Sequence, residues 1–331
     1  MARFLRLLAD ILVPFLFFLS VLAASSSLEA RAAARTSPPK GCLVVRRSGT
    51  KAGEYSTISA ALAAVKANGC VFIYGGTYAE QMRITTAGLK IYGYTTDISS
   101  YKSNTVTITH KLGSHDAGSL DASSTVNVVA TDFSMYNINV ENTYGTAGQA
   151  VALTANGVRQ GYYGCSFKSF QDTLYAKAGY QYYSNCYIEG AVDYIFGDAA
   201  AWFGECTIAS VRGGYITASS RTNADDTAWY VFDHSTITVA AGAQDVKGAV
   251  FLGRPWRVLA RVIYQFSSLS DIVNPEGWAP MAAGATPIFM EYQNTGAGAD
   301  TSKRKYLTPT KAAVSKSQLW PENSDWYDKT Y

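Results

Sequence analysis

The sequence predicts an all-β protein that folds as a single-domain parallel β-helix, a solenoid in which successive turns of strand stack on one another. Two observations support this fold. Beyond residue 70, short apolar segments alternate with Gly, Asn and Asp, as in a chain of short strands. Similar segments also recur around Cys165, Cys186 and Cys206, at spacings of 21 and 20 residues. A fixed period of this length is typical of a solenoid, and strand-like repeats favour its parallel β form.

The first residues resemble an export signal. Arg3 and Arg6 precede the apolar run Ile11–Leu22, and small residues follow. The alternative, a membrane anchor, is disfavoured because the run is shorter than the roughly 20 residues that a span needs. We therefore expect a signal peptide over residues 1–24 and a secreted, extracellular protein.

The remaining chain divides into a leader and one domain. Residues 25–40 are rich in Ala, Ser, Arg and Pro, which predicts a flexible leader. Residues 41–331 then form the β-helix domain, with a C-terminal tail packing on it. A monomer is the expected state.

Composition narrows the function classes. Of the 331 residues, 48% are hydrophobic and 16% charged, so the chain can bury a large core. The net charge is +3, and the basic residues are scattered, which argues against a nucleic-acid partner. Only three histidines are present and no C-x-x-C pair occurs, so we expect no metal site of the histidine-rich or structural-zinc kind.

One helix is expected before the repeats, where it would cap the N-terminal end of the solenoid. It should span Tyr55–Ala67, because Ile58, Leu62 and Val65 follow a helical period and Ser56 or Thr57 can cap its start. The first strands are then expected at 70–74, 89–92, 105–109, 125–129 and 137–140.

Five cysteines leave at least one thiol unpaired, and export would permit disulfides. Cys42 and Cys70 flank the predicted helix and could join the first two strands. Cys165, Cys186 and Cys206 should stack as an internal ladder. One adjacent pair could be bonded, or the three could be small buried apolar residues, and we favour the second interpretation for at least one of them.

Two aspartates share the period of the cysteines. Asp172 and Asp193 are 21 residues apart, and each follows its cysteine by seven residues. If the cysteines stack, the aspartates face the same side of adjacent turns, about 4.8 Å apart along the axis. Such a pair cannot ionise twice without cost, so one pKa rises and the other stays low. That arrangement supplies an acid beside a base or nucleophile.

The alternatives for this pair are a calcium site and a purely structural ladder. A hard cation prefers six or more oxygen ligands. The neighbours of the two aspartates are mainly Thr, Leu, Tyr, Ile and Phe, which offer few such ligands. Serine-hydrolase chemistry has less support still, because the sequence contains no G-x-S-x-G motif.

Three further polar residues fit ester chemistry. Gln149 and Gln171 are 22 residues apart, close to one period, and their amides could donate to a developing oxyanion. Taken alone, Gln149 is better explained by a loop hydrogen bond. Arg254 could orient a carboxylate through two parallel hydrogen bonds, or could form an ordinary surface ion pair.

Aromatic residues crowd the same segments, namely Tyr175, Phe196, Trp256 and Trp278. Exposed rings are good platforms for the C–H faces of sugars. A stack inside the solenoid is the simpler interpretation of any single ring, but four rings that flank the acid pair favour a sugar-binding surface.

Five motifs, in order, resemble those of the pectin methylesterase (pectinesterase) family and run through most of residues 41–310. They are Gly76-Thr77-Tyr78-Ala79-Glu80, Gln149-Ala150-Val151-Ala152-Leu153, Gln171-Asp172-Thr173-Leu174, Asp193-Tyr194-Ile195-Phe196-Gly197 and Leu252-Gly253-Arg254-Pro255-Trp256. The segments Gly190–Asp193 and Val273–Trp278 look most similar to the fungal branch.

The resemblance implies a right-handed β-helix with a cleft that binds methylated pectin (homogalacturonan) and releases pectate and methanol without a cofactor. By the same resemblance, Asp193 is the nucleophile and Asp172 the general acid and base. Gln149 and Gln171 hold the oxyanion, and Arg254 orients Asp193. The substrate-binding residues implied are Tyr175, Phe196, Arg254, Trp256 and Trp278.

Two other functions are open to a β-helix of this kind. A pectate lyase or polygalacturonase would need a calcium cluster with a base, or acids placed around a glycosidic bond, and the motifs fit neither. A polysaccharide-binding solenoid without activity is disfavoured because the set of polar site residues is complete.

Overall fold

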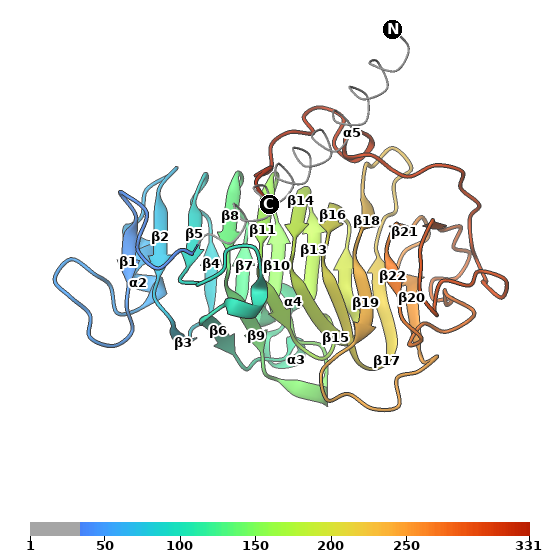
Figure 1. Ribbon diagram of the computed structural model, residues 1–331, viewed down its shortest axis with the longest axis horizontal. Helices are drawn as coiled ribbons and strands as arrows, with labels where there is room; N and C mark the ends of the chain where they lie inside the picture. The colour runs from blue at the N-terminus through green and yellow to red at the C-terminus, as the bar shows by residue number, and fades with distance from the viewer. Residues whose placement is uncertain (1–33) are drawn as a thin grey trace, which may run out of the picture.

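The computed structural model describes residues 34–331 and has the predicted architecture. Strands progress along one axis from β1 to β23, and every pair of named strands in this part of the chain is parallel (Figure 1). The parallel β-helix is therefore confirmed. The core is a continuous column of buried apolar side chains that runs from Val45 in the first turn to Phe289 in the last.

One face of the solenoid is a ten-stranded sheet. Its order is β1-β2-β5-β8-β11-β14-β16-β18-β21-β23. The strands are β1 (Leu43–Val45), β2 (Cys70–Ile73), β5 (Lys90–Gly93), β8 (Phe133–Tyr136), β11 (Gln160–Tyr163), β14 (Tyr180–Ser184), β16 (Ala200–Gly204), β18 (Trp229–Asp233), β21 (Arg261–Gln265) and β23 (Ile288–Tyr292).

The other thirteen strands form two faces that two long strands join, β15 (Tyr187–Gly197) and β17 (Thr207–Ser219). The first half of β15 pairs with β12 and its second half with β13, so the strand belongs to both faces. The remaining members are β3 (Gly76–Ala79), β4 (Met82–Ile84), β6 (Val106–His110), β7 (Val126–Val128), β9 (Asn139–Asn142), β10 (Leu153–Asn156), β12 (Ser166–Lys168), β13 (Leu174–Ala178), β19 (Thr236–Val239), β20 (Val250–Pro255) and β22 (Ser268–Leu269).

The predicted helix is present but shorter. Helix α2 spans Ile58–Ala64, and the Thr57 hydroxyl accepts a hydrogen bond from the Ala60 N–H at 3.2 Å, as a capping residue does. The disulfide between Cys42 and Cys70, which the sequence left open, is formed and joins β1 to β2 at this end. The other helices between residues 34 and 331 are single turns: α3 (Ser114–Ala117), α4 (Leu120–Ser123), α5 (Lys316–Leu319) and the 3₁₀ turns Tyr101–Ser103 and Gly145–Ala147.

The three central cysteines form the expected ladder but no disulfide. Cys165, Cys186 and Cys206 are all buried free thiols, so the possible bond between an adjacent pair is absent. Each thiol donates to a backbone carbonyl of the preceding turn; Cys186, for example, donates to the Tyr162 oxygen at 3.4 Å. The interpretation as small buried residues therefore holds for all three.

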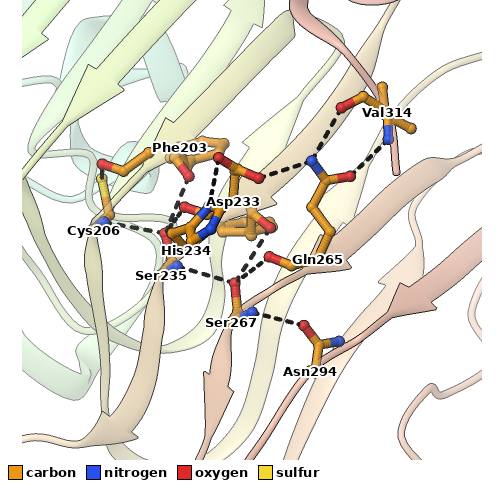
Figure 2. A network of polar contacts seen from close by, with 11 residues as sticks. Phe203, Cys206, Asp233, His234, Ser235, Gln265, Ser267, Asn294 and Val314 are labelled. Atoms are coloured by element: carbon orange, nitrogen blue, oxygen red, sulfur yellow. Dashed lines mark hydrogen bonds and ion pairs between the residues drawn. The ribbon is translucent and has the colours of Figure 1, made fainter. Parts of the chain in front are cut away.

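The cysteine ladder continues as a polar one toward the C-terminus (Figure 2). The side chain of Ser235 accepts from the Cys206 N–H at 3.1 Å, that of Ser267 from the Ser235 N–H at 3.0 Å, and that of Asn294 from the Ser267 N–H at 3.0 Å. Each turn thus satisfies a buried backbone donor of the turn before it, as buried polar groups require.

The C-terminal segment returns along the ten-stranded sheet, where Figure 1 shows it in red. Gln265 exchanges two hydrogen bonds with the backbone of Val314 (Figure 2). Trp320 is fully buried and donates to the Ala200 oxygen at 3.0 Å. Farther along, the Tyr331 hydroxyl accepts from Arg35 at 2.8 Å, so both ends of the described chain meet on this face.

The boundary of the leader differs from the expectation. Residues 34–40 were expected to be flexible, yet the backbone of Arg35 pairs with Thr95 through bonds of 2.9 and 3.1 Å. The ordered chain therefore begins before residue 41. The signal segment 1–24 lies outside the described residues. Among residues 34–331, the structure contains no helix with the length and apolar character of a membrane span.

Candidate active site

The two aspartates lie on adjacent turns of one face. Leu174 pairs with Ile195 and Tyr175 with Phe196, so β13 and β15 are in register. The Asp172 N–H donates to the Val192 oxygen at 3.1 Å. Asp172 and Asp193 therefore occupy equivalent positions on adjacent turns, about one strand spacing apart. This is the alignment that the 21-residue period predicts.

Both aspartates have left-handed backbone conformations, with φ of +63° for Asp172 and +48° for Asp193. This region is sparsely populated by residues other than glycine, although Asp tolerates it better than most. The left-handed conformation of Asp193 coincides with a break in the regular pairing of β15, between Val192 and Ile195. Both carboxyl groups line one pocket, although their residues are only 2% and 8% exposed.

Arg254 holds Asp193 with a two-pronged contact. Its Nε donates to Oδ1 at 2.9 Å and its Nη2 to Oδ2 at 2.7 Å. The guanidinium lies 3.8 Å above the ring centre of Tyr215, which fixes the plane of the fork. This geometry leaves Asp193 a charged, oriented carboxylate whose rotation is restricted.

Asp172 has a different environment. Gln149 Nε2 donates to its Oδ2 at 2.8 Å, and no Lys or Arg side chain among residues 34–331 forms an ion pair with it. Burial raises the pKa of Asp172 to about 8, and the neighbouring charge of Asp193 acts in the same direction, while Gln149 and Arg254 oppose the shift. Asp172 therefore carries a proton at neutral pH, and the pair presents one acid beside one carboxylate.

A small pocket of about 70 Å³ opens between the two carboxyl groups. It is lined by Leu120, Gln149, Asp172, Asp193, Phe196, Ala218, Trp256 and Met281. Sequence reasoning missed Leu120, Ala218 and Met281. It also missed Ser114, whose hydroxyl donates to Gln149 Oε1 at 3.3 Å and so orients that amide toward Asp172. Ser114, Leu120 and Met281 come from helical turns and a loop that carry no periodic signal, whereas Ala218 lies on β17, in register with Phe196.

Three of the four aromatic residues gather at this pocket. Tyr175 stacks on Phe196 with ring centres 4.3 Å apart, and Trp256 meets Phe196 edge-on at 5.9 Å. Tyr175 and Trp256 are partly exposed, whereas Phe196 is buried beneath them.

The expectation that Trp278 lines a sugar subsite is wrong. Trp278 is fully buried, stacks on Phe289 at 4.2 Å, and donates to Glu291 at 3.2 Å. Its backbone is bridged to Gly253, which is aligned through Thr217 with Ile195. These residues form one row along the axis, and the side chain of Ile195 faces the core. Side chains alternate between faces along a strand, so this row points into the core and the next row points into the cleft.

Gln171 lies next to the pocket without lining it. Its backbone is bridged to Val192, and its oxygen accepts from the Ala150 N–H at 3.0 Å. Its side chain is partly exposed and has no hydrogen bond to residues 34–331, so the amide is free to meet a ligand. In the same part of the chain, no three His, Cys, Asp or Glu side chains are grouped as metal ligands.

A family model named Pectinesterase matches residues 43–321, most of the chain. The chain belongs to the pectinesterase family. It is 61% identical to pectinesterase A of Emericella nidulans over 90% of this chain and 92% of that relative. The predicted family, its fungal branch and the enzyme class, a carboxylic ester hydrolase, are thereby confirmed.

Solved structures agree. A crystal structure of the pectin methylesterase from Aspergillus niger superposes with a TM-score of 0.87 at 58% identity, covering 90% of this chain and all of that one. Pectin methylesterase from carrot gives a TM-score of 0.76 at 31% identity, covering 83% and 90%. The family's fold and its activity as a pectinesterase therefore extend to this chain.

Proposed function

We propose that this pectinesterase removes methyl groups from homogalacturonan with Asp193 as nucleophile and Asp172 as general acid and base. The observation that carries the proposal is the unequal pair: the Arg254 fork holds Asp193 as a carboxylate, while burial keeps Asp172 protonated with a pKa of about 8. Each group is then in the protonation state that the first step requires.

In the first step, an Asp193 oxygen attacks the ester carbonyl carbon, and negative charge develops on the carbonyl oxygen. The amides of Gln149 and Gln171 donate to that oxyanion; Gln149 has a second N–H besides the one given to Asp172. The C–O bond to the methoxy group then breaks, and Asp172 transfers its proton to the leaving oxygen. Methanol departs, and the galacturonate acyl group remains on Asp193 as an anhydride.

In the second step, Asp172, now a carboxylate, takes a proton from a water molecule that attacks the anhydride carbonyl. The bond to Asp193 breaks, which releases the galacturonate acid and restores the carboxylate that Arg254 holds. Asp172 ends protonated, so the cycle closes without a cofactor or any other reactant than water.

Substrate binding follows from the surface around the pair. Tyr175 and Trp256 offer partly exposed ring faces next to the carboxyl groups, with Phe196 supporting them from below. We assign the sugar subsites to these rings and to Arg254. The pattern of residues 1–24 and a substrate found in plant cell walls support a secreted, extracellular enzyme. A monomer stays the expected state.

The test is methanol release from highly methylated pectin in the presence of EDTA, with chain length and the absorbance of unsaturated ends followed in the same sample. We expect methanol with unchanged chain length and no new absorbance. Shortened chains or unsaturated ends without methanol would show that the solenoid cleaves glycosidic bonds, as a glycoside hydrolase or a lyase does, instead of methyl esters.

A further inference from the structure

The catalytic pocket contains one side chain that the esterase mechanism does not use and that oxidants attack, the thioether of Met281. This residue lines the pocket together with the two carboxyl groups. It lies in the loop that follows Trp278, and it is 44% exposed. Met281 thus combines access from solvent with closeness to the reacting groups.

The other methionines of residues 34–331 have a different environment. Met82, Met135 and Met290 are 6%, 0% and 9% exposed and belong to the packed core. The three free cysteines are buried as well. Because oxidation of a sulfur side chain follows its exposure, an oxidant in solution reaches Met281 before any of these groups.

The loop that carries Met281 is fastened to the strand that carries Arg254. The N–H groups of Ala279 and Ala282 each donate to a carbonyl oxygen of β20 at 3.0 Å. The two carbonyls belong to the residues directly before and after Arg254. The backbone therefore keeps Met281 at the pocket, and a change in the chemistry of its side chain acts there.

The pocket is small and mostly apolar. It measures about 70 Å³, and its apolar members besides Met281 are Leu120, Phe196, Ala218 and Trp256. Oxidation of the thioether to a sulfoxide introduces a strongly polar oxygen into this lining. That oxygen can only accept hydrogen bonds, so it opposes the negative charge that develops in the first step and takes room from the apolar methoxy group.

We propose that Met281 is an oxidation site through which a peroxide lowers the activity of this esterase. The sulfur attacks one peroxide oxygen, so that an S–O bond forms and the O–O bond breaks. With hydrogen peroxide, the proton of the transferred oxygen moves to the departing hydroxide, which leaves as water. The sulfur loses two electrons and the peroxide gains two. The proposal rests on the proposed function, because it requires the ester group to enter this pocket.

The test treats the folded enzyme with dilute hydrogen peroxide, locates the added oxygen by mass spectrometry of peptides and follows methanol release from pectin over the same time course. We expect the peptide with Met281 to gain one oxygen at least about tenfold faster than those with Met82, Met135 or Met290. The value of kcat/KM should fall in step, by about tenfold at complete oxidation, as for a polar group placed in an apolar lining. The midpoint of thermal unfolding should stay the same.

Two variants separate this thioether from every other group that peroxide can modify. Met281→Leu keeps the apolar character but lacks the sulfur, so its own rate should be equal before and after treatment. Met281→Gln places a polar side chain of similar length at the pocket, and its kcat/KM without peroxide should approach that of the fully oxidised wild-type enzyme. Methionine sulfoxide reductases should restore the initial rate of the oxidised wild type.

Three results would each overturn the proposal: oxidation of Met281 without a fall in kcat/KM, oxidation of the buried methionines at the same rate, or an equal loss of activity in treated Met281→Leu. Failure of the proposed function looks different. The untreated wild-type enzyme would then release no methanol, while the mass shift at Met281 would still appear.

Discussion

Two aromatic ladders on different faces of the solenoid have similar geometry and different surroundings. On the ten-stranded sheet, Tyr92, Tyr136 and Tyr163 stack with ring centres 4.8 Å apart at each step. On the cleft face, Tyr175 and Phe196 stack at 4.3 Å. Strand register alone produces both, because residues one turn apart must lie side by side.

The two ladders differ in whether another segment of the chain covers them. The first ladder is overlaid by the C-terminal segment: the rings of Tyr331 and Tyr163 are 5.1 Å apart, and Trp320 is buried against the neighbouring Tyr182 at 6.2 Å. Nothing equivalent among residues 34–331 covers Tyr175 or Trp256, which remain partly exposed. One ladder therefore stabilises the fold, and the other is available to a sugar chain. Five substitutions test that distinction.

The largest effect should come from the acid pair beside the open ladder. We expect Asp193→Ala and Asp172→Ala each to reduce kcat by at least about 10³-fold, since nucleophile and proton transfer are both lost. Methanol release measures the loss, and thermal unfolding should show little change. Turnover near the wild-type rate in either variant would disprove the mechanism.

The second-largest effect is expected for a residue that covers the ladder on the ten-stranded sheet. Trp320→Ala removes a fully buried ring that also donates to Ala200, and should cost about 3–5 kcal/mol of unfolding free energy. Urea unfolding measures the cost. In conditions where the variant stays folded, KM for pectin should equal the wild-type value, and a selective rise in KM would mean that this face also binds substrate.

Tyr175→Ala is the matched change on the open ladder. It should raise KM for pectin by about five- to thirtyfold, the equivalent of roughly 1–2 kcal/mol of ring stacking. The midpoint of thermal unfolding should shift far less than in Trp320→Ala. A large loss of stability with unchanged KM would assign both ladders to the fold.

The smallest effect concerns the proton on Asp172. Because its pKa is about 8, the protonated acid disappears as pH rises, and kcat/KM should fall above about pH 8. Gln149 lowers this pKa by donating to the carboxylate, so Gln149→Leu should move the alkaline limb to higher pH by up to about one unit. The pH profile of kcat/KM measures the shift; movement to lower pH would contradict the assignment.

The sequence predicted those parts of the site that repeat with the turns. The 21-residue period aligned Asp172 with Asp193, because register in a parallel stack depends on turn length alone. It could not predict the orientation of Trp278, since the turns around β20 have irregular lengths that hide which row a residue joins.

The rest of the site depends on segments outside the repeat. Leu120 and Met281 reach the pocket from a short helical turn and a loop, where no spacing indicates direction. Likewise, nothing in the sequence distinguished a covered aromatic ladder from an open one. That distinction depends on where the C-terminal segment crosses the solenoid, which only the folded chain shows.

The free thiols in the centre of the solenoid are unreactive while the protein stays folded. Burial raises the pKa of Cys165 and Cys186 well above the usual range for a thiol, so alkylating reagents find neither access nor thiolate. Modification therefore has to wait until the middle turns separate. The rate of alkylation therefore measures how often the turns that carry Asp172 and Asp193 open. The native cysteines serve as the probe, so no residue has to be introduced.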